Sequence, residues 1–344
     1  MHKIGHGGNL RQAESLFPAA PRPWIDLSTG INPHAYPFSQ PPATAFARLP
    51  EPDDLARLRQ TAALAYGVSS ADHVVAAAGT QILLPLLIEA VFGRTTPHLK
   101  QAAILSPTYA EHRQMARLAG FAVRETGNVA DLYDADLAIL VNPNNPDGRL
   151  VSRGDLLALG AHMEAKGGLL VVDEAFMDVV ETKGQGPAQS VADRVHGGLA
   201  VLRSFGKFYG LAGIRLGFAI AAPAIAARLS AHLGPWTIPG PTLAIGLEAL
   251  ADTGWQHAMR ERLQVEAERL NALLAAAGLE VLGGTSLFRY VRHAAARDVF
   301  ERLGRAGIFV RTFPERPDHL RFGLARPDDW PRLKHALCPE NRQA

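Results

Sequence analysis

The chain has 344 residues, of which 47% are hydrophobic and 20% are charged, and its formal net charge is +2. This length allows a large buried core and favours about two domains. The near-neutral charge without a long run of one sign argues against nucleic-acid and membrane-surface binding, so we expect a small ligand.

The cysteine content and the apolar runs bear on the compartment. Cys338 is the single cysteine, which rules out an internal disulfide framework and a thiolate metal cluster within one chain. Residues 1–10 lack the apolar stretch of a secretory signal, and no segment reaches the ~20 apolar residues of a membrane span. We therefore expect a soluble, cytoplasmic protein without a metal site.

The first half of the chain begins with a proline-rich stretch, residues 18–52, which predicts an extended arm with turns. Beyond it, short apolar runs alternate with helical patterns, which is typical of a mostly parallel sheet. The strands are expected at residues 74–78, 102–105, 137–141, 169–172, 200–202 and 216–220.

The pattern changes at about residue 240. An amphipathic helix over residues 256–277 precedes short apolar runs at 279–282, 287–291, 308–313 and 320–324. These predict a smaller α+β domain after a large α/β domain. We expect the large domain at residues 30–240 and the smaller one at 241–344, with an N-terminal arm at 1–29.

Asp173 ends an apolar run, residues 168–173, that has hydrophobic residues on both faces. A parallel strand that is covered by helices on both faces can place such a residue at its carboxyl end. Open α/β sheets bind their ligands at that end of the strands. An aspartate that caps a following helix is the alternative.

Lys207 is followed by three glycines and by Arg215, and Ser204 precedes it. A lysine amine is a poor nucleophile at its free pKa of about 10.4, and a nearby positive charge or desolvation lowers that pKa. Arg215 and a bound cofactor could supply that environment. On these residues alone, a surface lysine in a glycine-rich loop fits equally well.

The segment from Ser204 to Gly217 is similar to the cofactor-lysine motif of the fold-type I pyridoxal-phosphate (PLP) enzymes, the aminotransferase superfamily. The resemblance implies that Lys207 carries PLP as a Schiff base and that Ser204 and Arg215 hold its phosphate. It also implies that Asp173 faces the pyridinium nitrogen and keeps it protonated, so that the ring can act as an electron sink.

The turn after the run 137–141 contains two Asn-Pro pairs and resembles the superfamily's Asn-Pro-Thr-Gly turn. By this resemblance Asn145 donates a hydrogen bond to the phenolic oxygen of the cofactor, with Asp147 in the place of the threonine. A plain loop would explain the prolines equally well.

Two further cofactor contacts are implied. Gly79 and Thr80 stand between a predicted strand and a helix, where backbone amides can bind the phosphate. Tyr109 is expected to stack on the ring, although it could also be a core residue. Arg321 interrupts an apolar run, and the resemblance implies that it binds the α-carboxylate of the substrate; simple exposure on a sheet face is the alternative.

The arm begins with His6-Gly-Gly-Asn9 and continues to Asn32, and it closely resembles the opening of threonine-phosphate decarboxylases of cobalamin biosynthesis. These enzymes convert O-phospho-L-threonine to aminopropanol phosphate and CO2. His6, Asn9 and Asn32 could donate hydrogen bonds to the substrate phosphate, although a histidine so near a terminus is often only exposed.

Two other functions stay open on the sequence alone. A histidinol-phosphate-type aminotransferase would share the Lys207 region but lack the His-Gly-Gly-Asn start. A non-catalytic protein that retains the fold is the third possibility.

Two positions depart from the pattern of the relatives. Phe176 stands where many have a tyrosine that contacts the phenolic oxygen of the cofactor. Leu49 stands where many have a tyrosine that reaches the cofactor phosphate of the neighbouring subunit. A homodimer is still expected, because the active sites of this superfamily lie between subunits.

Overall fold

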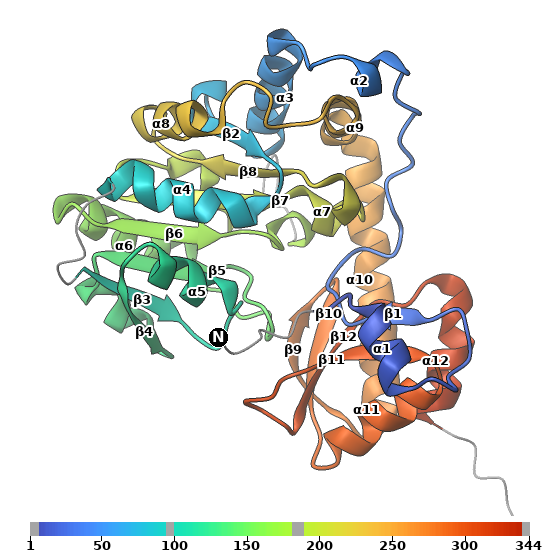
Figure 1. The fold of residues 1–344 in the computed structure, drawn as a ribbon. Helices are drawn as coiled ribbons and strands as arrows, with labels where there is room; N and C mark the ends of the chain where they lie inside the picture. Colours follow the sequence, from blue (N-terminus) through green and yellow to red (C-terminus); the bar gives the residue numbers. More distant parts are fainter. Residues whose placement is uncertain (1–6, 94–99, 181–188, 339–344) are drawn as a thin grey trace, which may run out of the picture. The chain divides into compact units, whose positions relative to one another are not determined.

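The computed structural model describes residues 7–93, 100–180 and 189–338 (Figure 1). The chain divides into two compact units. The larger unit contains Tyr36–Asn145 and Arg149–His257, and the smaller unit contains the residues up to Ala35, Pro146–Gly148 and the residues from Ala258 onward.

The larger unit is built on a seven-stranded sheet with the order β2-β8-β7-β6-β5-β3-β4. Its strands are β2 (Val74–Ala77), β3 (Gln101–Leu105), β4 (Ala122–Thr126), β5 (Leu137–Val141), β6 (Leu169–Asp173), β7 (Leu199–Ser204) and β8 (Gly217–Ile220). β3 to β7 pair in parallel, and β8 runs antiparallel to both β2 and β7. The predicted mostly parallel sheet is confirmed. Strand β4 was missed because its residues are largely exposed and form no apolar run.

Helices cover both faces of this sheet. They are α2 (Thr44–Ala47), α3 (Pro52–Ala65), α4 (Thr80–Phe92), α5 (Glu111–Leu118), α6 (Arg153–Ala165), α7 (Phe205–Phe208), α8 (Pro223–Leu233) and α9 (Gly240–Ala251). Short 3-10 turns lie at Ala71–His73, Val129–Asp134, Met177–Val179, Ala192–Arg194 and Ala212–Ile214. Several helices begin with a proline, whose missing N–H costs nothing at that position.

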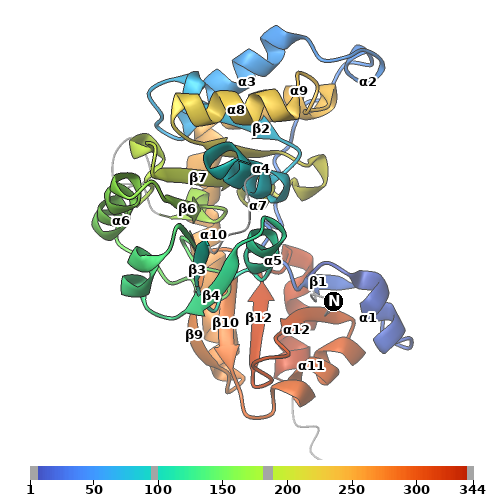
Figure 2. The same ribbon diagram turned by 60° about the vertical axis from the view of Figure 1, so that its left-hand side comes forward.

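The core of the larger unit follows from the alternation of side chains along each strand. One set of alternate strand residues, such as Val171 and Leu202, packs against α4, α5 and α8. Figure 2 shows α4 and α8 beside each other on that face. Helix α6 packs against β6 and β7 with Leu156, Leu159 and Met163 buried. The buried strands β2 and β5 are therefore apolar throughout, and β6 is apolar up to Asp173 at its end.

The smaller unit contains a five-stranded sheet with the order β1-β11-β12-β10-β9. Its strands are β1 (Ile25–Leu27), β9 (Glu280–Thr285), β10 (Phe288–Arg292), β11 (Ile308–Thr312) and β12 (His319–Gly323). Its helices are α1 (Leu10–Leu16), α11 (Ala296–Arg305) and α12 (Trp330–Leu337), with a 3-10 turn at Pro327–Asp329, and α10 (Thr253–Ala276) begins in the larger unit.

The N-terminal arm is part of the smaller sheet. Its three residues Ile25–Leu27 pair in parallel with β11, which the proline-rich sequence did not reveal because the strand is so short. The predicted boundary at residue 240 stays a prediction. In the structure α9 packs on α3, and Gly246 leaves room there for Leu58 and Leu216.

Two surveys of the described residues bear on the nature of the protein. In the three described ranges no helix is both long enough and apolar enough to cross a lipid bilayer. The same ranges contain no group of three or more His, Cys, Asp or Glu side chains placed to hold a metal ion.

Candidate active site at the carboxyl edge of the larger sheet

A cavity of about 170 Å³ lies in the larger unit where parallel strands end. Strand β5 ends at Val141, which is in register with Asp173 at the end of β6, and both line the cavity. The eight residues predicted to contact the cofactor all line this cavity: Gly79, Thr80, Tyr109, Asn145, Asp173, Ser204, Lys207 and Arg215. Their individual roles stay predictions, but the structure brings them together.

Lys207 lies in α7, a single helical turn that directly follows β7. Gly206 is needed beside it, because a Cβ there would lie 2.7 Å from the Cα of Ala212. Stacked rings hold the turn: Tyr209 lies 4.2 Å from Phe205 and 5.6 Å from Trp255, measured between ring centroids. The lysine Nζ lies 5.6 Å from the Phe176 ring centroid. Lys207 is therefore carried by a rigid turn inside the cavity.

Thr80 and Arg215 form one end of the cavity. Gly79 precedes α4 with φ 97°, and a Cβ on it would lie 2.7 Å from Nη2 of Arg215. Arg215 itself has a left-handed backbone at φ 56°, which is strained for a residue with a side chain. A Cβ on Gly217 would lie 2.7 Å from the Thr80 amide nitrogen. The glycines thus let a guanidinium approach the N-terminus of α4, an arrangement suited to an anion.

Asp173 is 5% exposed and has a partner for each oxygen. Its Oδ1 accepts a hydrogen bond of 3.0 Å from the Ala175 amide. Its Oδ2 lies 3.0 Å from Nε2 of His112, a buried residue of α5. Sequence analysis missed His112, whose only signal was its position three residues after Tyr109. The two contacts fix the orientation of the carboxylate toward the cavity.

The turn that carries Asn145 is held by two other asparagines. Asn142 accepts a hydrogen bond of 2.8 Å from the Val151 amide, and the amide of Asn144 donates to the carbonyl of Arg149 at 2.8 Å. The side chain of Asn144 also accepts a hydrogen bond of 2.8 Å from Thr108. Asn142 and Asn144 are both buried. The asparagine-rich sequence therefore builds the base of the turn and presents Asn145 to the cavity.

A buried charge cluster lies behind Asp173. Arg203 alternates with Leu202 on β7 and so points to the opposite face of the sheet. Its Nη1 donates to Glu174 at 2.8 Å, and its Nη2 donates to Asp178. Burial raises the pKa of Glu174, and the Arg203 charge acts against this rise. The cluster anchors both ends of the segment 174–178, which follows Asp173 and contains Phe176.

Arg203→Met is expected to lower the free energy of unfolding by about 3–5 kcal/mol, because it leaves two buried carboxylates without their cation. Arg297→Met is the matched control, since Arg297 is exposed and pairs with Glu301 at 3.3 Å on one helix. The control should change stability by less than about 0.5 kcal/mol. Denaturant unfolding measures both, and equal stabilities would contradict the assigned importance of the cluster.

The smaller unit contains the predicted substrate residue Arg321. It is 7% exposed, and its Nη2 donates to the carbonyl of Ser28 at 2.8 Å. Its partner in the β11–β12 register is Arg311. Burial, followed by the charge of Arg311, lowers the pKa of Arg321 to about 9. Sequence analysis missed Arg311, because its place near the end of an apolar strand is the only feature that marks it in the sequence.

Of the three arm residues predicted to bind the substrate phosphate, the structure describes two, Asn9 and Asn32. A Cβ on Gly7 would lie 2.3 Å from the carbonyl oxygen of Ser28, which also receives the Arg321 bond, so the glycine lets the start of the arm pack there. Asn32 is buried, and its Oδ1 accepts a hydrogen bond of 2.8 Å from the amide of His34. Asn9 caps α1 through its Oδ1, which leaves its NH2 group as the predicted donor. His6 lies outside the described residues.

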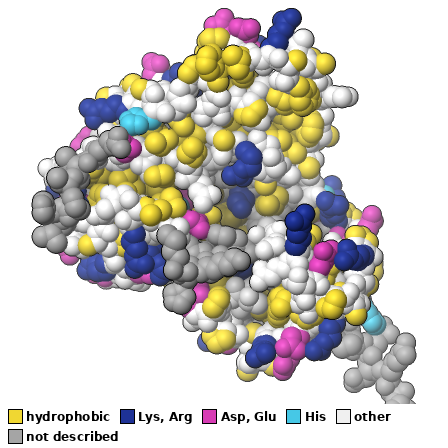
Figure 3. All heavy atoms as spheres, in the orientation of Figure 1, with side chains coloured by type: hydrophobic (Ala, Val, Ile, Leu, Met, Phe, Trp, Pro, Cys, Tyr) yellow, Lys and Arg dark blue, Asp and Glu magenta, His cyan; other side chains and the backbone are white. Residues whose placement is uncertain are grey.

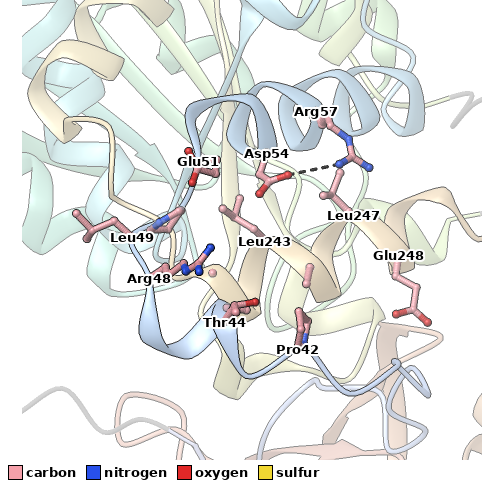
Figure 4. Close-up of a pocket in the computed structure, with 14 residues that line it drawn as sticks. Pro42, Thr44, Arg48, Leu49, Glu51, Asp54, Arg57, Leu243, Leu247 and Glu248 are labelled. Carbon is pink, nitrogen blue, oxygen red and sulfur yellow. Dashed lines mark hydrogen bonds and ion pairs between the residues drawn. The ribbon is translucent and has the colours of Figure 1, made fainter.

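A second, larger cavity of about 500 Å³ lies elsewhere in the larger unit, between α2, the start of α3 and α9. Figure 4 shows Leu243 and Leu247 of α9 in this groove, with Asp54 paired to Arg57 at 3.4 Å. Leu49 is one of its lining residues. In Figure 3, hydrophobic side chains gather over this part of the unit. The groove contains none of the residues predicted to act in catalysis.

Comparison with known proteins supports one family. The family model described as "Aminotransferase class I and II" matches residues 24–331. A threonine-phosphate decarboxylase of Pseudomonas aeruginosa is 41% identical over 343 residues, which cover 97% of each chain. One from a Sinorhizobium species is also 41% identical and covers 94% of this chain and 93% of its own. A histidinol-phosphate aminotransferase of Mesorhizobium japonicum is 30% identical, covering 89% and 85%.

Solved structures agree with the fold. A histidinol-phosphate aminotransferase from Sinorhizobium meliloti, solved with pyridoxal 5'-phosphate, superposes with a TM-score of 0.76 at 20% identity and covers 98% of both chains. An L-threonine-O-3-phosphate decarboxylase from Porphyromonas gingivalis gives a TM-score of 0.72 at 21% identity, covering 90% of this chain and 97% of its own. At these identities the likeness concerns the fold.

Proposed function

The chain belongs to the aminotransferase class I and II family, and from this premise we propose that it is a PLP-dependent decarboxylase of O-phospho-L-threonine. Its products are aminopropanol phosphate and CO2, and its place is cytoplasmic cobalamin biosynthesis. The observation that carries the choice of reaction is the 41% identity to two threonine-phosphate decarboxylases over 94–97% of this chain. Histidinol-phosphate aminotransferases reach about 30%.

The cavity of the larger unit fits PLP. Its strained Arg215 and the close approach at Gly79 make a cationic cup for a phosphate. Asp173, fixed by His112 and the Ala175 amide, offers a carboxylate for the pyridine nitrogen. Lys207 supplies the amine that binds the aldehyde carbon. A PLP molecule held by these residues would supply an electron sink for the pair left on the substrate Cα when a bond there breaks.

The residues that hold the substrate then determine which bond at Cα breaks. With the cofactor bound, the pose that these residues give the substrate would decide which bond at Cα is activated. Arg321, with Arg311 beside it, offers two guanidinium groups to a substrate that carries both a carboxylate and a phosphate. After CO2 has left with the Cα–carboxylate bond broken, the Lys207 amine is the group that returns a proton to Cα.

Arg321→Lys is expected to raise the KM for O-phospho-L-threonine by about 10- to 100-fold, because an ammonium cannot make the two parallel bonds of a guanidinium. The binding of PLP should change much less, since Arg321 belongs to the smaller unit. Arg326→Lys is the control, because Arg326 is exposed just beyond the same strand. Steady-state kinetics and PLP titration measure both, and an unchanged KM would remove Arg321 from the substrate site.

The proposed reaction is tested by incubating the purified protein with O-phospho-L-threonine and, separately, with histidinol phosphate plus 2-oxoglutarate. We expect aminopropanol phosphate in the first mixture and no turnover in the second. Consumption of histidinol phosphate without aminopropanol phosphate would instead identify an aminotransferase. A colourless protein that binds no PLP would identify a non-catalytic member of the fold.

A homodimer belongs to the same proposal. Leu49 lines the groove of Figure 4 and exposes 64% of its surface, and Phe46, in helix α2, exposes 69%. Exposed apolar side chains that lie together mark interaction surfaces. We expect light scattering to give twice the chain mass of 36.9 kDa. Phe46→Glu with Leu49→Glu should shift the mass to that of a monomer, and a monomeric parent protein would contradict the proposal.

A further inference from the structure

The turn that carries Lys207 is joined to a cluster of aromatic rings. This turn, α7, is only four residues long, and a helix of one turn has too few internal hydrogen bonds to be stable alone. The two residues that follow the lysine, Phe208 and Tyr209, are 1% and 2% exposed. The position of the Lys207 backbone therefore depends in part on what these two rings pack against.

Trp255, in the first turn of α10, packs against both of these rings. Its indole stacks on Tyr209, with the ring centroids 5.6 Å apart and the ring planes at 11°. It also packs edge-on against Phe208, at 5.4 Å between centroids. Phe205, which precedes the lysine, stacks on Tyr209 as well, at 4.2 Å. One indole ring thus contacts both residues that follow Lys207.

Tyr36 contacts the same cluster through its ring, its amide and its hydroxyl. Its ring packs edge-on against Trp255 and Tyr209, at 5.1 and 6.4 Å between centroids. Its amide donates a hydrogen bond of 2.9 Å to the carbonyl of Tyr209. Its hydroxyl donates to Oδ2 of Asp252 at 3.2 Å. Burial and the Asp252 carboxylate raise the pKa of this hydroxyl to about 12, so it stays a neutral donor at physiological pH.

Asp252 connects Tyr36 to the start of α10. While its Oδ2 accepts the bond from Tyr36, its Oδ1 accepts a hydrogen bond of 2.9 Å from the amide of Trp255. Such a bond to an amide in the first turn is a helix cap, which fixes the first turn of α10 and with it the indole. Tyr36, the Lys207 turn, Asp252 and Trp255 all belong to the larger unit. The arrangement is therefore complete within that unit.

We propose that Tyr36, Asp252 and Trp255 form a clamp on α7 that positions the Lys207 amine in the cofactor cavity. None of the three is among the described residues that line the cavity, so they are positioning residues that act through the turn. The inference rests on the proposed function in that Lys207 binds PLP and returns a proton to Cα. Both steps need the reacting atoms at a near-attack distance, so a small displacement of the amine slows both.

Trp255→Leu is the principal test, because leucine stays apolar but lacks the flat ring that stacks on Tyr209. We expect faster hydrogen exchange at the backbone amides of residues 205–210 in the protein without PLP. We also expect about tenfold slower attachment of PLP to Lys207 and about tenfold lower kcat, with the KM for O-phospho-L-threonine within about twofold of the parent value. A merely structural role would lower stability and leave both rates of the folded protein unchanged.

Two milder variants keep the test usable if Trp255→Leu fails to fold. Trp255→Phe keeps a ring for stacking, so it should restore most of the rate that Trp255→Leu loses. Tyr36→Phe keeps the ring and the amide bond and removes only the hydroxyl that donates to Asp252. We expect it to attach PLP about threefold more slowly than the parent protein, as the loss of one hydrogen bond predicts.

The matched controls are Trp236→Leu and Tyr133→Phe. Trp236 exposes 59% of its surface, and the ring of Tyr133 lies 5.0 Å from that of His162, measured between centroids. Neither Trp236 nor Tyr133 is among the described residues that line the cavity. Both control variants should attach PLP and turn over the substrate at the parent rates.

The clamp and the proposed function fail in distinguishable ways. If Trp255→Leu and Tyr36→Phe exchange amides and attach PLP as their controls do, the clamp is overturned while the enzyme stands. Faster exchange with an unchanged rate of attachment would also overturn it, because the rings would then stabilise the turn without positioning the amine. If the parent protein attaches no PLP but Trp255→Leu still speeds exchange at residues 205–210, the clamp stands and the proposed function falls.

Discussion

Lys207→Ala is expected to abolish the covalent attachment of PLP and to lower the rate of decarboxylation by about 10³-fold or more. The substitution removes the amine that binds the cofactor and later returns a proton to Cα. The turn itself should survive, because Phe205, Phe208 and Tyr209 are buried and pack around it without the lysine side chain. Absorbance of the lysine-bound cofactor and single-turnover release of CO2 measure the two effects.

Lys166→Ala serves as the control for this variant, since the Lys166 amine only donates to the carbonyl of Tyr133 at an exposed site. It should keep the absorbance band and the full rate. A small primary amine added to Lys207→Ala should restore part of the rate, because it replaces the missing group. A Lys207→Ala protein that keeps the band would show that another amine carries the cofactor.

Asp173→Asn is expected to lower kcat by about 10²- to 10³-fold while PLP still attaches to Lys207. The change keeps the shape of the side chain but removes the negative charge that favours a protonated pyridine nitrogen, and with it the electron-accepting power of the ring. The substitution also alters the contact with Nε2 of His112. Cofactor absorbance and the rate of a single turnover separate binding from chemistry.

Asp193→Asn is the matched control, because this aspartate pairs with Arg153 at the surface, outside the cavity. We expect a near-normal kcat for it. If Asp173→Asn also turned over normally, the carboxylate would not be the partner of the pyridine nitrogen, and its buried bonds to His112 and Ala175 would be structural.

The strands that bring the site together could be predicted because each is a short apolar run with a polar residue at its end. Asp173 was found in this way, and the order of the motifs around Lys207 and Asn145 indicated one ligand. Strand β4 was missed because its exposed residues leave no apolar pattern. Strand β1 was missed because three residues between prolines resemble a loop.

The residues that support the site could not be predicted because their roles arise from distant contacts. His112 reaches Asp173 across 61 positions of sequence, and Arg203 reaches Glu174 across 29. In the sequence, nothing distinguishes Gly283 from any other strand glycine. The structure shows that a Cβ on Gly283 would collide with the carbonyl oxygen of Asp147. Sequence motifs identify the residues that contact a cofactor, whereas the residues that hold those motifs in place can be identified only from the fold.

The central claim is that the bond broken at Cα is the one to the carboxylate. The most direct test supplies O-phospho-L-threonine with deuterium on Cα, in ordinary water, and examines the product by mass spectrometry. Decarboxylation predicts aminopropanol phosphate that retains the deuterium on the carbon next to nitrogen, together with one hydrogen from water. Loss of the deuterium with retention of the carboxylate would show that the Cα–H bond breaks instead, and would contradict the account.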